Sequence, residues 1–402
     1  MIIEMKKLLS VSEIINSSVK EFEGERPYLK TGNLNDDGTF VLEKYSYEDK
    51  PSRANQNVRV NDIIFARMEN TKKVLGIEEA TKDIIVSTGF VVLRLNRSII
   101  DPEYLYHVIN SEMFQKQKNK YCKGATQKAI NNQGLSKIMI PVPDLEEQRR
   151  IAASLNKTYS LIKKRKEAIA KLDELVQSYF LHVVGPLAKG YKNWKKIKVQ
   201  DVAKSERGSM RTGPFGSDLK HSEFVDEGIA VLGIDNAVKN HFTWGERRFI
   251  TQEKYEKLKR YTVKPKDVII TIMGTTGRSA VIPEEIPLAI TTKHLATITL
   301  NRDIALPEFL SYAIHSHPEI LYQILKSNKG AIMNGLNLTV IKGLELNLPP
   351  LEEQKKFQYF YTQIQSQRES MMRSLTLIEE SFQSLLQHAF KGELSFNKKT
   401  IY

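Results

Sequence analysis

A glycine-rich and basic loop at residues 207–220 has the clearest chemical pattern in the chain. It reads RGSMRTGPFGSDLK. Glycines allow backbone amides to approach phosphates closely, while Arg211 and Lys220 supply positive charge. Polar side chains in such a loop can also bond the edges of bases. The loop therefore predicts contact with DNA, and a glycine-rich surface turn is the alternative that the pattern leaves open.

Cationic and amide side chains of the same kind occur in both halves of the chain. In the second half the predicted DNA contacts are Arg207, Ser209, Arg211, Thr212, Ser217, Lys220, Asn236, Lys239, Arg247, Arg248, Arg278, Lys293 and Asn334. In the first half they are Asn33, Arg67, Asn70, Lys72, Lys73, Gln127 and Lys128. Each residue alone is typical of a solvated surface. The group is informative because it recurs in both halves.

Catalytic and cofactor-binding patterns are not recognisable. Gly208 and Gly213 have the glycine spacing of a phosphate loop, but Pro214-Phe215 follow where lysine and a hydroxyl residue are needed. His315 and His317 are too few for a metal site. The prolines of Asn347–Leu351 have neither the spacing nor the aromatic residue of an amino-methyltransferase loop. We therefore expect a non-catalytic chain without a cofactor or metal of its own.

The sequence contains an internal duplication, which should place these residues on two similar units. The motif Leu-Glu-Glu-Gln at Leu145–Gln148 recurs at Leu351–Gln354, 206 residues later. Other pairs keep an offset of 205 or 206: Asn61–Ile64 with Lys266–Ile269, Leu95–Arg97 with Leu300–Arg302, Pro102–Leu105 with Pro307–Leu310, and Lys123–Ala125 with Lys329–Ala331. This period is too long for a solenoid, so we interpret it as two copies of a globular unit followed by a helix.

The two motifs begin long helical patterns with a narrow apolar seam. The seam positions are Ile151, Leu155, Ile162, Ile169, Leu172, Val176, Phe357, Tyr361, Ile364, Met371, Leu375, Ile378 and Phe382. Their three-four spacing fits a partner helix. We expect an antiparallel coiled coil under a pseudo-twofold arrangement, with two unrelated amphipathic helices as the alternative. Arg165 and Arg368 are polar interruptions of the two seams.

The repeat predicts an α+β fold and five segments. These are a first globular unit (1–142), a first spacer helix (143–185), a second unit (186–348), a second spacer helix (349–392) and a C-terminal tail (393–402). Within the units we expect strands at 58–67, 84–95, 263–273 and 288–300, helices at 102–118 and 307–326, and last strands at 138–143 and 344–349.

Composition limits the partners. Sixty Lys and Arg against 47 Asp and Glu give a net charge of +13, which favours a polyanion such as nucleic acid. Cys122 is the only cysteine, so a disulfide framework is excluded and a reducing cytoplasm is expected. The sequence has no apolar run long enough to span a membrane and no signal-peptide core.

Taken together, these motifs resemble the specificity subunit of type I restriction–modification systems. The resemblance covers essentially the whole chain. It rests on Pro143–Gln148 and Pro349–Gln354, on the turns at Gly124-Ala125 and Gly330-Ala331, and on Thr212–Ser217, which is similar to a Gly-Pro-Phe-Gly-Ser stretch of the family's target recognition domains. The first unit departs from it, because no such loop occurs near Glu23–Lys30, and the loop that reads DNA there stays open.

The resemblance implies a function and partners. Each unit would be a target recognition domain that reads one half of a split, asymmetric site in double-stranded DNA, and the helices would set the gap. Methylation subunits, expected to be two, would use S-adenosylmethionine to methylate adenine. Restriction subunits would use ATP and Mg²⁺, so that none of this catalysis belongs to the chain itself. A coiled-coil scaffold without specific DNA recognition is the alternative.

Overall fold

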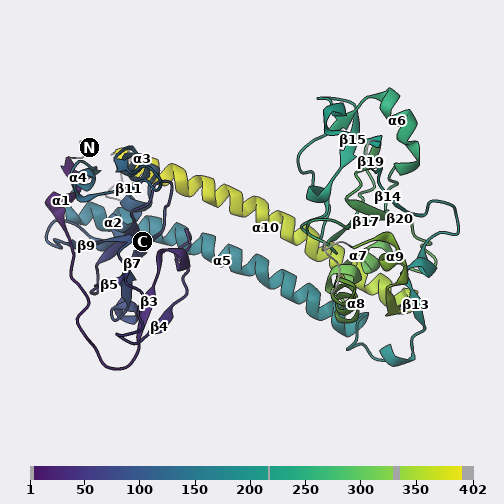
Figure 1. Ribbon diagram of the computed structural model, residues 1–402, viewed down its shortest axis with the longest axis horizontal. Helices are drawn as coiled ribbons and strands as arrows, with labels where there is room; N and C mark the ends of the chain where they lie inside the picture. Colours follow the sequence, from purple (N-terminus) through teal and green to yellow (C-terminus); the bar gives the residue numbers. More distant parts are fainter. Residues whose placement is uncertain (1–3, 216–217, 329–335, 392–402) are drawn as a thin grey trace, which may run out of the picture. The chain divides into compact units, whose positions relative to one another are not determined.

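The computed structural model describes residues 4–215, 218–328 and 336–391. The chain divides into two compact units: unit 1 comprises Met1–Lys166 and Arg373–Tyr402, and unit 2 comprises Glu167–Met372. The boundary between them crosses both long helices. Each unit combines small sheets with helices (Figure 1), and the predicted α+β fold with two repeated domains is confirmed.

Unit 1 contains two four-stranded sheets. The first has the order β2-β9-β6-β7: Ser12–Ile14, Phe90–Leu95, Ile63–Ala66 and Val74–Gly76. The second has the order β4-β3-β8-β5: Glu43–Tyr45, Arg26–Leu29, Ile85–Ser87 and Ala54–Asn57. Two short antiparallel strand pairs complete unit 1. They are β1 with β12 (Met5–Lys7, Met139–Pro141) and β10 with β11 (Cys122–Lys123, Ala129–Ile130). Its helices are α1 (Leu8–Val11), α2 (Pro102–Asn110), α3 (Glu112–Lys120), α4 (Asn132–Leu135), the first part of α5 (Leu145–Val183) and the last part of α10 (Leu351–Lys391).

Unit 2 repeats this plan. One sheet has the order β14-β20-β17-β18: Met210–Thr212, Leu295–Ile298, Val268–Thr271 and Ser279–Val281. The other has the order β16-β15-β19: Phe249–Ile250, Ile229–Leu232 and Ala289–Thr291, and β13 (Lys196–Lys198) pairs with β21 (Glu345–Asn347). Its helices are the last part of α5, α6 (Gln252–Leu258), α7 (Pro307–Ser316), α8 (Pro318–Asn328), α9 (Leu338–Gly343) and the first part of α10 (Leu351–Lys391).

Two elements predicted as continuous are broken in both units. The expected strand 84–95 is β8 and β9, which belong to different sheets, and 288–300 divides in the same way into β19 and β20. A Cβ at Gly89, which follows β8, would lie 2.6 Å from Thr31 Oγ1, so a larger residue at the crossing between the sheets would have to displace the Thr31 side chain. The expected helix 102–118 ends at Asn110, and Ser111 caps α3 by accepting from Phe114 N. In the second copy α7 ends at Ser316 and α8 begins at Pro318, which cannot continue the preceding helix.

The glutamine of each Leu-Glu-Glu-Gln motif attaches a long helix to its unit. Gln148 Oε1 accepts from Asp101 N (2.8 Å), and its Nε2 donates to the carbonyls of Ile99 and Pro143. Gln354 Oε1 accepts from Leu306 N (2.9 Å), and its Nε2 donates to Ile304 and Pro349. Both side chains are fully buried. The repeated motif is therefore a hydrogen-bonded anchor at the start of α5 and α10.

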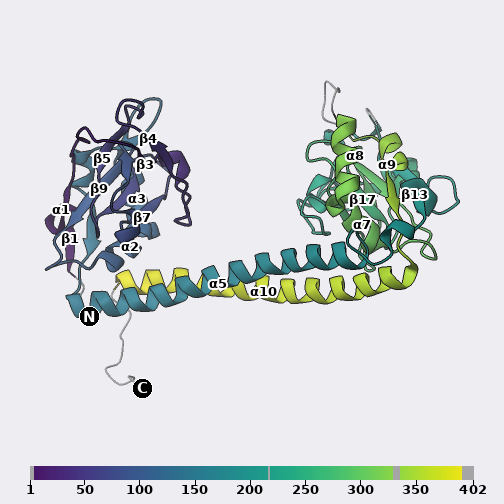
Figure 2. The same cartoon turned by 90° about the horizontal axis from the view of Figure 1, so that it is seen from below.

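Within each unit α5 and α10 lie side by side and antiparallel (Figure 2). In unit 1 the ring of Tyr159 packs on Phe382, and Lys166 pairs with Glu379. In unit 2 Tyr179 stacks on Phe360, and Asp173 pairs with Arg368. Of the predicted seam residues, Ile151, Leu155, Ile162, Leu172, Val176, Phe357 and Ile364 are buried, and Ile169, Tyr361, Met371, Leu375, Ile378 and Phe382 are half-buried. Among the described residues no helix is long and apolar enough to cross a membrane.

Candidate nucleic-acid interface

A groove opens in each unit beside the carboxyl end of one strand of a parallel pair, which is β8 in unit 1 and β19 in unit 2. Strands β3 and β8 are parallel neighbours in unit 1, as β15 and β19 are in unit 2. The carboxyl ends of parallel strands lie at the same edge of a sheet, which is a common place for binding residues. In both units the segment that follows β2 or β14 forms part of the groove wall. The duplication therefore places comparable surfaces in both units.

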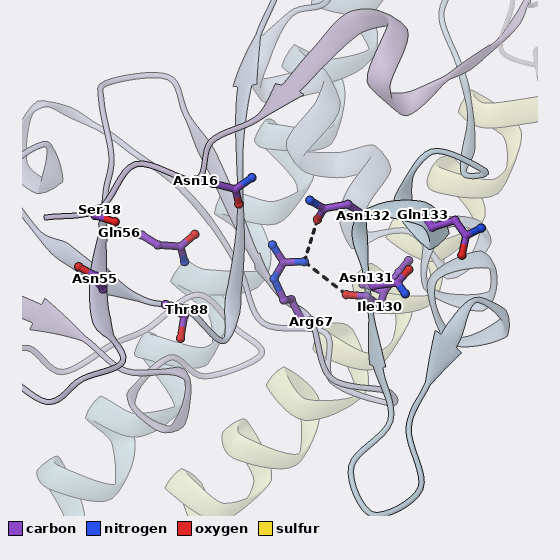
Figure 3. Close-up of a pocket in the computed structure, with 10 residues that line it drawn as sticks. All are labelled: Asn16, Ser18, Asn55, Gln56, Arg67, Thr88, Ile130, Asn131, Asn132 and Gln133. Atoms are coloured by element: carbon purple, nitrogen blue, oxygen red, sulfur yellow. Dashed lines mark hydrogen bonds between the residues drawn. The ribbon is translucent and has the colours of Figure 1, made fainter.

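The groove of unit 1, which we call the amide groove, has a volume of about 710 Å³. It is lined by Asn16, Ser18, Asn55, Gln56, Arg67, Thr88, Ile130, Asn131, Asn132 and Gln133. Arg67 is the only ionisable residue among these ten. Figure 3 shows its guanidinium between one wall formed by Asn16, Gln56 and Thr88 and another formed by residues 130–133. Carboxamides offer a donor and an acceptor together, which suits the edges of bases.

Arg67 connects the two walls of the amide groove. Its Nε donates to Phe90 O (3.2 Å), and its Nη1 donates to Ile130 O and Asn132 Oδ1, both at 3.4 Å. Burial lowers the pKa of Arg67, but a guanidinium stays protonated in proteins. The predicted DNA contact at Arg67 therefore lies in the groove, with most of its donors already bonded to the protein.

The carboxamides of the groove divide into fixed and open ones. Gln56 is buried and its Nε2 donates to Ser87 O and Phe90 O, while Asn55 Oδ1 accepts from Val19 N. Asn131 caps α4 by accepting from Gly134 N. Asn16, Asn132 and Gln133 are exposed. These three can therefore reach a ligand without breaking a turn or cap.

The remaining predicted residues of unit 1 gather beside this groove. The loop 67–73 joins the hairpin of β10 and β11, because Glu69 N donates to Lys128 O and Met68 bridges to Ala129. Lys128 and Gln127 are exposed on that hairpin. Lys73 Nζ donates to Thr31 O, and the amides of Asn70 and Asn119 bond each other. Lys72 belongs to the same loop, where burial lowers the pKa of its ammonium group, and the side chain of Asn33 donates to Glu43.

Lys118 supports the same loop from inside unit 1. Its side chain is fully buried, and Nζ donates to Ala66 O (3.4 Å) and to Thr71 O. Burial lowers the pKa of this ammonium to about 8. The lysine thus bonds the carbonyl of the residue before the loop, Ala66, and that of Thr71 within it.

The groove of unit 2 has a volume of about 680 Å³ and a different lining. Arg248 pairs with Asp235 (3.1 Å) and with Glu246 (3.1 Å) inside it. Pro214 contributes from the predicted loop, and Lys293 is exposed at the wall. A Cβ at Gly213 would lie 2.3 Å from the carbonyl of Thr292, so the loop can approach β19 only with glycine there. Charged pairs in unit 2 replace the neutral amides of unit 1.

The sequence left open which loop of unit 1 corresponds to the glycine-rich loop of unit 2, and the sheet topology identifies its counterpart. Strand β14 pairs with β20 as β2 pairs with β9, so the counterpart of Gly213–Phe215 follows β2. Asn16 and Ser18 lie in that segment. Sequence comparison missed it because these positions contain no glycine or proline.

Three predicted contacts of unit 2 are interior residues instead. Arg211 Nη2 pairs with Asp267 Oδ2 at 2.8 Å, and the arginine also donates to Gly208 O, Thr262 O and Thr299 Oγ1. Asn236 is buried, where it accepts from Gly233 N and donates to Thr243 O. Ser209 is also buried. These three residues are turned toward the interior of unit 2, so the structure does not present them to a ligand.

The other predicted residues of unit 2 lie at its surface. Arg207, Lys220, Lys239, Arg247, Arg278 and Lys293 are exposed, and Thr212 is half-buried in β14. The guanidinium of Arg247 lies 3.9 Å from the centre of the Trp244 ring. Lys239 borders a separate cavity between α7 and the long helices rather than the groove. Ser217 and Asn334 fall outside the described residues.

Several groove residues had no sequence signal. Asn16, Asn55, Gln56, Thr88, Asn132 and Gln133 are common surface residue types that lie far apart along the chain. Asn131 and Asn337 hold equivalent cap positions in the two copies and could have marked this wall. Across residues 4–215, 218–328 and 336–391, no group of three His, Cys, Asp or Glu could hold a metal ion.

Comparison with known proteins agrees with the duplication. The family described as type I restriction modification DNA specificity domain matches residues 3–171 and again residues 191–379. The EcoBI specificity subunit of Escherichia coli is 22% identical over 73% of this chain, which spans 65% of that protein's length. The MjaVIII specificity subunit of Methanocaldococcus jannaschii is 23% identical over 84% of this chain and 78% of its own length.

Two solved structures share the fold. A chain from a study of complex assembly and conformational transition in the type I R-M system has a TM-score of 0.59 at 20% identity, covering 97% of this chain and 98% of that one. The S subunit of a type I restriction–modification system from M. genitalium has a TM-score of 0.58 at 16% identity, covering 96% of both chains. With both repeats matched, the chain belongs to the family of type I restriction–modification DNA specificity subunits.

Proposed function

We propose that this chain reads a bipartite, asymmetric site in double-stranded DNA and directs methylation of adenine, and restriction, by partner subunits. The observation that carries the proposal is that a groove lies beside two matching segments in both copies of the specificity domain, namely the segment after β2 or β14 and the residue after β8 or β19. Two grooves with different linings suit two different half-sites. The net charge of +13 supports attraction to the phosphate backbone.

The partners follow from the same proposal. The chain would assemble with methylation subunits, two in number, and with restriction subunits. S-adenosylmethionine, ATP and Mg²⁺ would be bound by those partners, and this chain would supply recognition alone. The long helices would act as the spacer between the two readers, because α5 has 39 residues and a helix rises about 1.5 Å per residue.

Mapping of methylated adenines tests this proposal. The chain is produced with its methylation subunit in a host that lacks other adenine methylation, and the genome is sequenced for modified bases. We expect one motif with two defined halves and a fixed gap. Methylation without a split motif would contradict the reading of two half-sites. A stable complex that neither methylates nor shifts DNA in a gel would favour the scaffold alternative.

A further inference from the structure

The amide groove contains one residue pair whose geometry favours a particular base. Asn132 is exposed on the wall of the groove, and its Oδ1 accepts from Nη1 of Arg67. A carboxamide oxygen has two lone pairs, so Oδ1 keeps one acceptor site and Nδ2 keeps both donors. Figure 3 shows the two side chains meeting near the middle of the groove.

Arg67 itself is poorly placed to read a base by two bonds. A guanidinium makes paired bonds along an edge that includes Nη2 and either Nε or Nη1. Here Nε is bonded to Phe90 O, and Nη1 is bonded to Ile130 O and Asn132 Oδ1. Each edge therefore has one nitrogen engaged within the protein. The recognition of guanine through O6 and N7, which needs two donors side by side, would require these bonds to break.

The charge of Arg67 instead fixes the orientation of the Asn132 amide. A cationic donor attracts the carbonyl oxygen and disfavours the flipped amide, which would point its NH₂ group at the guanidinium. The donor and acceptor of Asn132 are then presented in a defined order. Adenine offers the matching pair in the major groove, an acceptor at N7 and a donor at N6.

We propose that Asn132 reads an adenine within the half-site of unit 1 and that Arg67 is the positioning residue that orients it. This assignment rests on the proposed function. Under this assignment the two half-sites are read by different side-chain chemistry, because the groove of unit 2 contains the Arg248–Asp235 pair instead of open amides.

The test compares base preferences of the full chain with those of two variants. Asn132→Ala removes the reader, and Arg67→Lys keeps a positive charge but cannot make the three bonds of the guanidinium. Motifs are mapped by adenine methylation with the methylation subunit and, in parallel, by selection of bound duplexes from a random-sequence pool. Gln387→Ala, which removes an exposed amide of α10 in the same unit, is the matched control.

We expect both variants to lose about tenfold of the preference for adenine at one and the same position of one half-site. The other half-site serves as an internal reference and keeps its preferences, which a general loss of folding would not allow. The control keeps the complete motif. An unchanged preference for adenine in Asn132→Ala, with a split motif in the parent chain, overturns this inference and leaves the proposed function standing. The absence of any split motif in the parent chain overturns both.

Discussion

The guanidinium of Arg211 lies 2.8 Å from the carboxylate of Asp267 inside unit 2. Asp62 is the counterpart of Asp267 in unit 1, and there Arg94 of β9 supplies the cation with two bonds of 3.1 and 2.9 Å. The two aspartates follow equivalent turns, at which Asn61 and Lys266 adopt positive φ angles of 68° and 65°. A buried carboxylate is thus neutralised in both copies, although the arginine comes from different strands.

Arg211→Ala should therefore lower stability rather than alter base preference. Removal of one partner leaves Asp267 buried and unpaired, which costs about 3–5 kcal/mol of unfolding free energy. Chemical denaturation followed by circular dichroism measures the loss. Arg207→Ala, at an exposed position of the same loop, should stay within about 0.5 kcal/mol of the parent. Weaker DNA binding by a fully stable Arg211→Ala chain would restore this arginine as a DNA contact.

The repeated glutamines provide a second stability test. Gln148→Ala removes bonds to one backbone N–H and two backbone carbonyls, all of them partly buried. Leaving such groups without a partner costs about 1–3 kcal/mol each before relaxation, and we expect a net loss of about 2–4 kcal/mol. Gln354→Ala should cause a loss of similar size, since its bonds are the same. Gln383→Ala, an exposed residue of α10, should be neutral in the same denaturation assay. A neutral Gln148→Ala would show that the anchor does not hold the helix.

The buried Lys118 should make the unfolding free energy depend on pH. Its pKa falls from the ordinary 10.5 to about 8 on folding. Below pH 8 both states carry the proton, whereas between pH 8 and 10.5 the unfolded chain keeps a proton that the folded chain releases. The unfolding free energy should therefore rise with pH in this window, by roughly 3 kcal/mol at most.

The difference between the parent chain and Lys118→Met isolates this contribution from other titrating groups. Urea denaturation at several values between pH 7 and 10.5 should show the rise in the parent and its loss in the variant. Lys116→Met, at an exposed position of α3, should retain the rise. Parallel curves for the parent and Lys118→Met would mean that the buried ammonium keeps its ordinary pKa.

The sequence predicts local and repeated features well, and the groove poorly. Apolar residues at heptad spacing determine a helix from neighbouring positions, so the seam of α5 and α10 could be read directly. The amide groove combines Asn16, Gln56, Arg67 and Asn132, which only the pairing of distant strands brings together. Arg211 was misplaced because a glycine-rich loop suggests exposure, whereas the three-residue strand β14 turns this side chain inward. Charge alone does not distinguish a DNA contact from a buried ion pair.

The paired helices predict how the half-site gap depends on protein length. Lys166 pairs with Glu379 within unit 1, and Asp173 pairs with Arg368 within unit 2, so α5 and α10 run antiparallel in each unit. Seven residues inserted after Ala170, and seven after Arg373, preserve the heptad register in both helices. Each helix then lengthens by about 10 Å, the rise of about three base pairs of DNA. Under the proposed spacer role, the mapped motif should keep both half-sites and gain a longer gap between them. An insertion in α5 alone should instead break the seam and lower the unfolding midpoint. A paired insertion that methylates the original motif with its original gap would exclude the helices as the spacer.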